Sequence, residues 1–282
     1  MITTGQAIRL GAEQLREVPD PQVDTMALLE NVTGKTPLEL RLHPQDTLTA
    51  EQEERFRSLL LLRSRREPLQ YLLGTQCFYG LEFAVDERVL IPRPETETLC
   101  ELALRELDHT AHPHVLDLCT GSGAIAVTLK KHCPQAEVTA CDISPEALAV
   151  AERNAILNDV DVRFLQGDLL TPIAGEQYDL IACNPPYIES LECETLQPEV
   201  IREPRLALDG GADGLSFYRR LAADVPACLG KGGWMIVEVG DRQAEQVAGL
   251  LSDTKMFFTV ETHLDLYGIK RFVSARRTPS PT

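Results

Sequence analysis

The stretch Cys183–Glu189, CNPPYIE, carries groups that can bind a planar amino group. It follows an apolar run at 178–182, YDLIA, which has the character of a buried strand. Two prolines end that strand because neither can donate a hydrogen bond to a neighbouring strand. Asn184 offers an amide oxygen, Pro185 a backbone carbonyl and Tyr187 a flat ring. Together they predict a site for the NH2 group of a substrate.

Methyl transfer to such a nitrogen is the chemistry that this set favours. An amide or aryl-amine nitrogen is a poor nucleophile because its lone pair is delocalised. The Asn184 oxygen and the Pro185 carbonyl can hold its two hydrogens and aim the nitrogen at a methyl donor. They also stabilise the positive charge that grows on the nitrogen during attack, and Tyr187 can pack against the planar group. No strong general base is required beforehand, since the proton can leave after transfer.

A glycine-rich turn earlier in the chain predicts a nucleoside cofactor. In DLCTGSGAIAVTL, 117–129, Gly121 and Gly123 permit a tight turn before a helix whose N-terminus can face an anion. Asp142 ends the next strand, 19 residues beyond Gly123, where a carboxylate accepts hydrogen bonds from ribose hydroxyls. The spacing from Gly121 to Ala126 fits both a dinucleotide and S-adenosylmethionine, so the turn alone does not separate them.

The third and fourth predicted strands favour S-adenosylmethionine. Nicotinamide chemistry has no evident use for Asn-Pro-Pro-Tyr, whereas methyl transfer does. Asp168, in QGDLL at 166–170, ends the third strand, where an acid commonly faces the adenine amino group in methyltransferases of this fold. Leu169 would supply an apolar wall to the adenine. A simple Gly-Asp turn is the alternative interpretation of this pair.

These residues need elements that bring strand ends together. Residues 1–73 have helical periodicity and predict a small bundle, with Thr49 as one cap. Residues 74–92 change to aromatic and β-branched residues and predict a β-hairpin, and another helix starts after Pro94. Beyond that, strands alternate with helices, as in a parallel sheet that binds ligands beyond its strands' carboxyl ends. The predicted strands are 114–119, 136–142, 160–166, 178–183, 233–239, 257–262 and 270–275, and the helices are 123–132, 145–157, 216–229 and 242–252.

Composition and charge narrow the classes of function. The 282 residues are 44% hydrophobic and 25% charged, as in ordinary globular proteins. No apolar run is long enough to span a membrane and the N-terminus lacks signal-peptide features, so a cytoplasmic location is expected. The eight scattered cysteines are expected to be reduced. No metal is expected at the histidine cluster of 109–114, and the tail 276–282 is expected to be disordered.

The net charge is −16 and is unevenly distributed. Residues 1–75 hold 9 Lys and Arg against 11 Asp and Glu, so the remainder carries −14. An acidic body repels phosphate backbones, which argues against stable nucleic-acid binding. We expect a monomer without a membrane or nucleic-acid partner.

Six motifs in order resemble the HemK/PrmC family of protein-glutamine N5-methyltransferases, which modify class I peptide chain release factors. The NPPY motif alone is shared with adenine and guanine amino-methyltransferases, whereas RPETE together with EPRLALDGGADGL is far more specific. The resemblance covers nearly the whole chain. The motifs are EPLQYLLGTQCFYGLEF at 67–83, VLIPRPETE at 89–97, DLCTGSGAIA at 117–126, CDIS at 141–144, NPPYIE at 184–189 and EPRLALDGGADGLSFYR at 203–219.

The resemblance implies an α/β fold, a Rossmann-like class I methyltransferase with a mostly parallel seven-stranded sheet. A small all-α N-terminal domain and a β-hairpin connector precede it. The implied domains are a substrate-recognition domain at 1–73, a hairpin linker at 74–92 and a methyltransferase domain at 93–282. The implied reaction moves a methyl group from S-adenosyl-L-methionine to the side-chain amide nitrogen of the glutamine in the Gly-Gly-Gln loop, a step connected with translation termination.

The resemblance also implies roles for single residues. Asn184, Pro185 and Tyr187 are expected to be catalytic, and with Pro186, Arg93 and Glu95 to bind the substrate. An alternative for Arg93, Glu95 and Thr96 is a helix start with an exposed ion pair. Cys119 departs from the family's usual glycine, and we expect an extended backbone there with weaker or repositioned cofactor contacts rather than lost binding. The residues expected at the cofactor are Cys119, Thr120, Gly121, Ser122, Gly123, Asp142, Ile143, Asp168, Leu169 and Asn184.

Three other classes of function fit the sequence less well. A nucleic-acid amino-methyltransferase should have a basic groove and a recognition domain rich in Lys, Arg and aromatic residues. The N-terminal domain at 1–73 is instead nearly neutral. A catalytically silent scaffold should have lost Asp142 or Asn184, and both are present. A nicotinamide dehydrogenase needs a catalytic His or a Tyr-Lys pair, and none is placed for hydride transfer.

Overall fold

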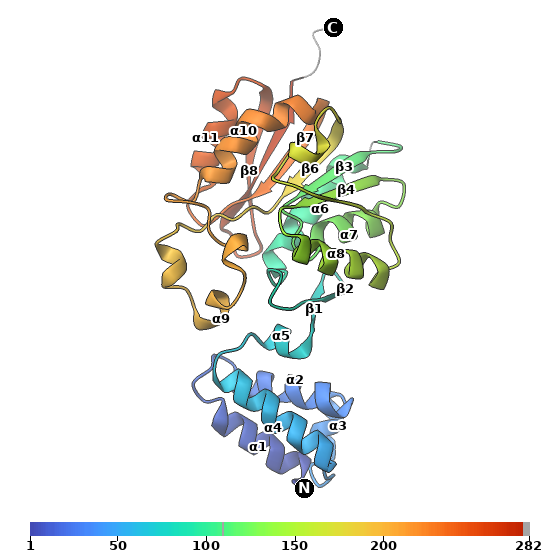
Figure 1. Ribbon diagram of the computed structural model, residues 1–282, viewed down its shortest axis with the longest axis vertical. Coiled ribbons are helices and arrows are strands. Elements are labelled where there is room, and N and C mark those ends of the chain that lie inside the picture. The colour runs from blue at the N-terminus through green and yellow to red at the C-terminus, as the bar shows by residue number, and fades with distance from the viewer. Residues whose placement is uncertain (109, 279–282) are drawn as a thin grey trace. The chain divides into compact units, whose positions relative to one another are not determined.

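A computed structural model describes residues 1–108 and 110–278 of the chain. The chain divides into two compact units, which Figure 1 colours from blue at the N-terminus to red at the C-terminus. The helical unit comprises Met1–Thr75 together with Gln197–Arg202. The sheet unit comprises Gln76–Leu196 and the residues from Glu203 onward. The segment 197–202 therefore belongs with the helical unit, although it lies far along the sequence.

The helical unit is a bundle whose apolar faces meet around residues such as Leu28, Phe56 and Leu60, all fully buried. The predicted cap at Thr49 is confirmed. Its hydroxyl accepts from the Gln52 backbone N–H, and the Gln52 side chain accepts from the Thr49 N–H, which forms a capping box. The helices are α1 (Thr4–Gln14), α2 (Pro21–Thr33), α3 (Pro37–Leu42), α4 (Ala50–Ser64), α5 (Leu69–Leu73) and α9 (Pro198–Ile201).

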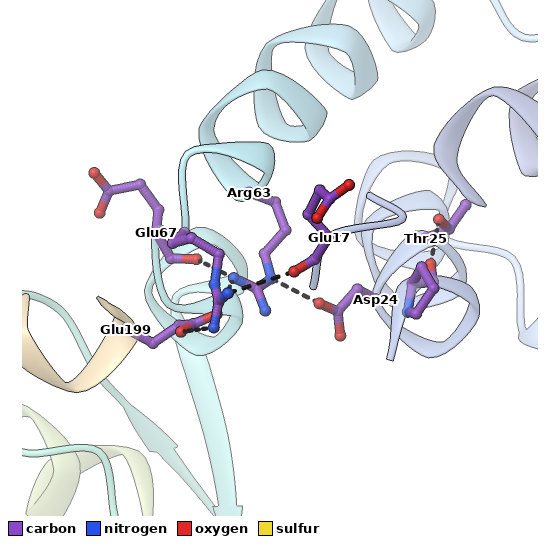
Figure 2. Close-up of polar contacts among 8 residues, drawn as sticks. Glu17, Asp24, Thr25, Arg63, Glu67 and Glu199 are labelled. Carbon is purple, nitrogen blue, oxygen red and sulfur yellow. Dashed lines mark hydrogen bonds and ion pairs between the residues drawn. The ribbon is translucent and has the colours of Figure 1, made fainter. Parts of the chain in front are cut away.

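An ion-pair cluster joins α2, α4 and α9 within this unit (Figure 2). The buried Arg63 donates from Nε to Asp24 Oδ2 at 2.6 Å and from Nη1 to Glu199 Oε1 at 2.8 Å. Arg66 donates to both oxygens of Glu199, each at 2.6 Å. Burial of Glu199 opposes ionisation, but the hydrogen bonds from Arg66 and Arg63 outweigh it and lower its pKa to about 2. Glu199 is therefore a carboxylate at neutral pH.

The sheet unit holds seven strands in the order β5-β4-β3-β6-β7-β9-β8. The pairs from β5 through β7 are parallel, and β9 is antiparallel to both β7 and β8. The predicted mostly parallel α/β sheet is therefore confirmed. The strands are β3 (His114–Leu118), β4 (Glu137–Asp142), β5 (Arg163–Gln166), β6 (Tyr178–Cys183), β7 (Leu229–Glu238), β8 (Phe257–Leu264) and β9 (Lys270–Arg277).

Helices cover both faces of this sheet, and each face has its own apolar core (Figure 1). One core packs residues of α10 and α11 against the sheet, including Leu221 and Val247. The other packs residues of α6, α7 and α8, including Leu99, Val127 and Ala155. The helices of this unit are α6 (Glu97–Leu107), α7 (Ala124–His132), α8 (Pro145–Leu157), α10 (Ser216–Cys228) and α11 (Ala244–Asp253).

Several predicted boundaries are wrong. β7 begins at Leu229 rather than at 233, because Leu229 already pairs with Tyr178 of β6 ahead of a register shift. β5 starts three residues later than predicted, and the hairpin strands β1 (Thr75–Phe78) and β2 (Leu81–Ala84) fill only part of 74–92. β9 extends to Arg277, into the segment predicted as a disordered tail. The rest of that prediction, at 279–282, and His109 of the histidine cluster lie outside the described residues.

The described residues contain neither a helix suited to cross a membrane nor a side-chain cluster suited to hold a metal ion. No helix among them is both long enough and apolar enough to cross a membrane. No group of three or more His, Cys, Asp or Glu side chains in the same part of the chain could hold a metal ion. All eight cysteines lie in the described ranges, where six are buried and none is paired.

Candidate functional site

The strands β3, β4, β5 and β6 end around a cavity of about 230 Å³. Most of the residues that the sequence assigned to a cofactor line it, and Pro186 lines it with them. Thr120, Ser122 and Gly123 do not belong to the lining residues; the side chains of Thr120 and Ser122 are buried in the turn behind it. The predicted residues that do line the cavity are Cys119, Gly121, Asp142, Ile143, Asp168, Leu169 and Asn184.

A buried carboxyl holds the turn between β3 and α7. Asp117 is fully buried, and its Oδ2 accepts from the Thr120 hydroxyl at 2.6 Å and from the Ala126 N–H at 3.1 Å. Its other oxygen has no partner among the described residues. Burial raises the pKa of Asp117 to about 7. Sequence reasoning assigned no role to Asp117, although an acid two residues ahead of the turn was a visible signal.

The backbone at Cys119 is not extended as predicted, since its φ is +59°. The turn begins at this residue: the Thr120 N–H donates to the Cys141 carbonyl, and the Gly123 N–H donates to the Thr120 carbonyl. These bonds leave Cys119 in the left-handed region, which costs a residue with a Cβ about 1–2 kcal/mol. The usual glycine would carry no such strain.

This strain predicts a difference between two variants. Cys119→Gly and Cys119→Ala both remove the thiol, but only glycine relaxes the backbone. We expect Cys119→Gly to be more stable than Cys119→Ala by about 1 kcal/mol, after allowing for the greater freedom of glycine in the unfolded chain. Urea unfolding of both proteins measures the difference. Equal stability would mean that the left-handed conformation carries no cost here.

Asp142 is oriented by its own strand end. Its Oδ2 accepts from the Gly121 N–H at 2.8 Å and its Oδ1 from the Ser144 N–H at 3.0 Å. Burial raises the pKa of Asp142 despite these bonds. Each oxygen keeps a further lone pair for a ligand hydroxyl. Ser144 caps α8, because its hydroxyl accepts from the Ala147 N–H at 3.1 Å.

Polar and apolar side chains face each other across the rest of the cavity. Asp168 pairs with Arg220 at 2.8 Å, and both side chains are nearly half exposed. Ile143, Leu169 and Phe217 supply apolar surface. The cavity therefore combines two carboxylates with hydrophobic walls.

Asn184 lies directly after β6 and is held by two buried residues. Its Nδ2 donates to the Thr96 hydroxyl at 3.3 Å, and that hydroxyl donates to Glu238 Oε2 at 2.6 Å. Thr96 ends the short helix η1 (Pro94–Thr96), and Glu238 ends β7. Sequence reasoning gave no role to Glu238, because nothing in the sequence links it to a threonine 142 positions away.

Tyr187 contributes to a second hollow beside the first. Its backbone carbonyl accepts from Gln243 Nε2 at 2.9 Å, and burial raises the pKa of its phenol well above the usual range. The Asn-Pro-Pro-Tyr segment thus lines the cofactor cavity through Asn184 and Pro186, and this hollow through Tyr187. The hollow is acidic, since Glu189, Glu192, Asp213 and Asp241 also line it.

A returning loop supports this segment from behind. The Ile188 N–H donates to the Leu208 carbonyl, and the Gly210 N–H donates to the Ile188 carbonyl. Gly210 lies so close that a Cβ there would be 2.7 Å from Tyr187 Cα. Only glycine fits at this contact. The loop belongs to the EPRLALDGGADGL motif, and the contact explains physically why that motif has glycine at 210.

Gly210→Ala is therefore expected to displace the Asn-Pro-Pro-Tyr segment. A shift of about 1 Å at a reacting centre can cost on the order of 100-fold in rate, and we expect a loss of that order in kcat. Steady-state methylation kinetics measure it. Gly249→Ala is the matched control: Gly249 is exposed in α11 with nothing near its Cβ position, so alanine should raise stability by about 0.5–1 kcal/mol and leave kcat unchanged. Wild-type kcat in Gly210→Ala would contradict the role of the contact.

Arg93 has a buried partner that the sequence did not indicate. Its Nη2 donates to Glu203 Oε1 at 2.5 Å, while Glu203 Oε2 accepts from the Ile91 N–H at 3.0 Å. Glu203 is only 4% exposed. Neither Arg93 nor Glu95 lines the cofactor cavity or the second hollow. Their assignment to substrate binding stays a prediction.

Comparisons with known proteins agree with this arrangement. Residues 96–239 match the methyltransferase small domain family, and residues 6–74 match the PrmC N-terminal domain family. A release factor glutamine methyltransferase of Geobacter sulfurreducens is 45% identical over 92% of this chain and 90% of its own. One of Deinococcus radiodurans is 43% identical over 92% of each. The catalytic domain of hMettl16 shares the fold at 18% identity, with a TM-score of 0.56 over 80% of this chain and 81% of that one. The chain belongs to the release factor glutamine methyltransferase family.

Proposed function

We propose that this protein transfers a methyl group from S-adenosyl-L-methionine to the side-chain amide nitrogen, N5, of the glutamine in the Gly-Gly-Gln loop of class I peptide chain release factors. The observation that carries the proposal is the position of Asn184. It lines the cofactor cavity and follows β6 directly. Pro185 is the next residue in the chain; it is buried and is not among the residues that line the cavity or the second hollow. The position of Asn184 supports the proposal that it binds the substrate amide next to the proposed cofactor.

The residues of the cavity fit S-adenosyl-L-methionine. Asp142 has lone pairs for ribose hydroxyls, and the carboxylate of Asp168 can accept from an adenine amino group. Ile143, Leu169 and Phe217 provide apolar surface for the adenine ring. When bound, this cofactor supplies an electrophilic methyl group on a sulfonium.

The proposed contribution of the protein's own residues is to hold and orient the substrate amide. The Asn184 oxygen and the Pro185 carbonyl accept the two N–H hydrogens, so the amide plane is fixed and the nitrogen is oriented for attack. As charge develops on the nitrogen, the same two oxygens stabilise it. Tyr187, in the second hollow, offers a ring against which the glutamine can pack.

The helical unit is proposed to recognise the release factor. It is an independent bundle with its own core and matches the PrmC N-terminal domain family. The alternative, methylation of adenine or guanine in nucleic acid, is less favoured because the net charge of −16 repels a phosphate backbone. Translation termination takes place in the cytoplasm, and the protein is proposed to act there as a monomer.

Mass spectrometry tests the function directly. A purified class I release factor is incubated with this protein and S-adenosyl-L-methionine, beside a short Gly-Gly-Gln peptide. We expect one added methyl group on the Gly-Gly-Gln glutamine and a preference for the intact factor. Methylation of RNA or DNA in place of the glutamine would reject the proposed function. Equal use of peptide and intact factor would reject recognition by the helical unit.

A further inference from the structure

A chain of two hydrogen bonds runs from Asn184 into the protein. The Asn184 amide donates to Thr96 Oγ1, and the Thr96 hydroxyl donates to Glu238 Oε2. Thr96 is 4% exposed and Glu238 is 1% exposed, so water does not compete for these groups. The three residues come from three separate elements, at the end of β6, in η1 and at the end of β7.

The chemistry of these groups fixes which way the amide points. A carboxylate only accepts hydrogen bonds, and a hydroxyl has a single proton to donate. Because the Thr96 proton is used by Glu238, Thr96 Oγ1 can only accept from Asn184. The NH2 end of the Asn184 side chain must therefore face Thr96, which turns its oxygen away from Thr96. A flipped amide would place two acceptors against each other.

We propose that Thr96 and Glu238 are positioning residues that orient the Asn184 amide so that its oxygen accepts from the substrate nitrogen. The identity of the substrate in this inference rests on the proposed function. The orientation of the Asn184 amide is independent of the proposed function. Glu238 lines neither the cofactor cavity nor the second hollow, and it acts through Thr96. This role explains why the Thr96 hydroxyl and the Glu238 carboxyl are buried, although neither is proposed to bind the substrate amide.

The orientation depends on the charge of Glu238. A protonated Glu238 can donate to Thr96, which frees the Thr96 proton to bond the oxygen of a flipped Asn184. Burial raises the pKa of Glu238 to about 7, against the hydrogen bond from Thr96. Because the ionised form is the active one, kcat should fall as the pH drops through about 7. The titratable and charged groups that face Glu238 are Arg93, Glu95, Cys100, Tyr187, Tyr218 and Arg271.

The test compares Thr96→Val, which removes the hydroxyl, with Thr96→Ser, which keeps it. At saturating S-adenosyl-L-methionine and with a release factor as substrate, Thr96→Val should lose up to about 100-fold in kcat, the order expected when a group that holds the reacting atom is misplaced by about 1 Å. Thr96→Ser should restore kcat, and both variants should bind the cofactor as the wild type does. Glu238→Gln should also lower kcat and should abolish the acid limb of its pH profile. Because the cofactor is saturating, the titration of groups that affect only cofactor affinity, such as Asp142, does not contribute to the pH profile of kcat.

A second readout does not depend on turnover. With selective 15N-asparagine labelling, the Asn184 NH2 resonances are assigned by their loss in Asn184→Ala. They should shift with pH around the Glu238 transition in the wild type and stay constant in Thr96→Val and Glu238→Gln. Wild-type protein that titrates in this way but methylates no release factor would reject the proposed function and keep the positioning role. Equal kcat in Thr96→Val and Thr96→Ser, or resonances that do not titrate in the wild type, would overturn the positioning role.

Discussion

Asn184→Ala is expected to lower kcat for methyl transfer by about 10²- to 10³-fold, or about 3–4 kcal/mol of transition-state stabilisation. The variant removes one of the two acceptors that hold the substrate amide. In this variant only the Pro185 carbonyl would stabilise the positive charge that develops on the substrate nitrogen. Cofactor affinity should be largely kept, since Asn184 is one of many residues that line the cavity. Single-turnover kinetics with a release factor measure the first effect, and calorimetry with S-adenosyl-L-methionine the second.

A matched variant separates this effect from the general loss of an asparagine. Asn31 is also half-buried, and its amide bonds the Leu73 carbonyl and Arg55 within the helical unit. Asn31→Ala should leave turnover of a short Gly-Gly-Gln peptide unchanged. If Asn184→Ala methylates the peptide as fast as Asn31→Ala does, Asn184 does not hold the reacting amide.

The fold of the sheet unit was largely predictable because its strands and helices are indicated by local sequence patterns. Buried strands such as YDLIA are apolar runs bounded by proline or glycine, and the cap at Ser144 precedes a proline at the first helical position. Boundaries failed where tertiary pairing overrode local signals. β7, for example, begins four residues earlier than predicted, because Leu229 already pairs with Tyr178 of β6.

In the site, too, positions set by local sequence were predictable, and contacts set by the packing of separate elements were not. Asp142 ends β4 and Asn184 directly follows β6. Because the ends of parallel strands meet at one edge of the sheet, the approach of these two residues could be deduced. The approach of Thr96 to Glu238, and of Gly210 to Tyr187, depends on how separate elements pack. No periodicity in the sequence encodes such a contact. The conformation of Cys119 was mispredicted because the bonds that impose it involve Cys141 on a neighbouring strand.

The segment 197–202 is the clearest case of information that the sequence hides. Its Glu199 lies 136 positions from Arg63, yet the two form an ion pair inside the helical unit. The predicted domain boundary at residue 73 gave no reason to add a short segment from beyond the Asn-Pro-Pro-Tyr motif. Because 197–202 is connected along the chain to that motif, the stability of the cluster bears on the loop between them.

Arg63→Met is expected to destabilise the helical unit by about 3–5 kcal/mol, the usual cost of removing one partner from a buried ion pair. The variant leaves the buried Asp24 without its 2.6 Å partner and takes one of two arginines from Glu199 (Figure 2). Methionine fills much of the volume, so lost packing contributes little. Urea unfolding followed by circular dichroism measures the loss. Hydrogen–deuterium exchange should place it in α2, α4 and residues 197–202.

Arg57→Met is the control on the same helix. Arg57 is half exposed and pairs with Glu53, which keeps the N-terminal amine of Met1 as a second partner. An exposed pair of this kind is worth about 0.2–1 kcal/mol, so this variant should unfold almost as the wild type does. Adding Asp24→Asn to Arg63→Met should recover part of the loss, because the cost arises from an uncompensated buried charge. If Arg63→Met is as stable as Arg57→Met, the cluster contributes nothing beyond the desolvation it costs, and segment 197–202 is held to the bundle by other contacts.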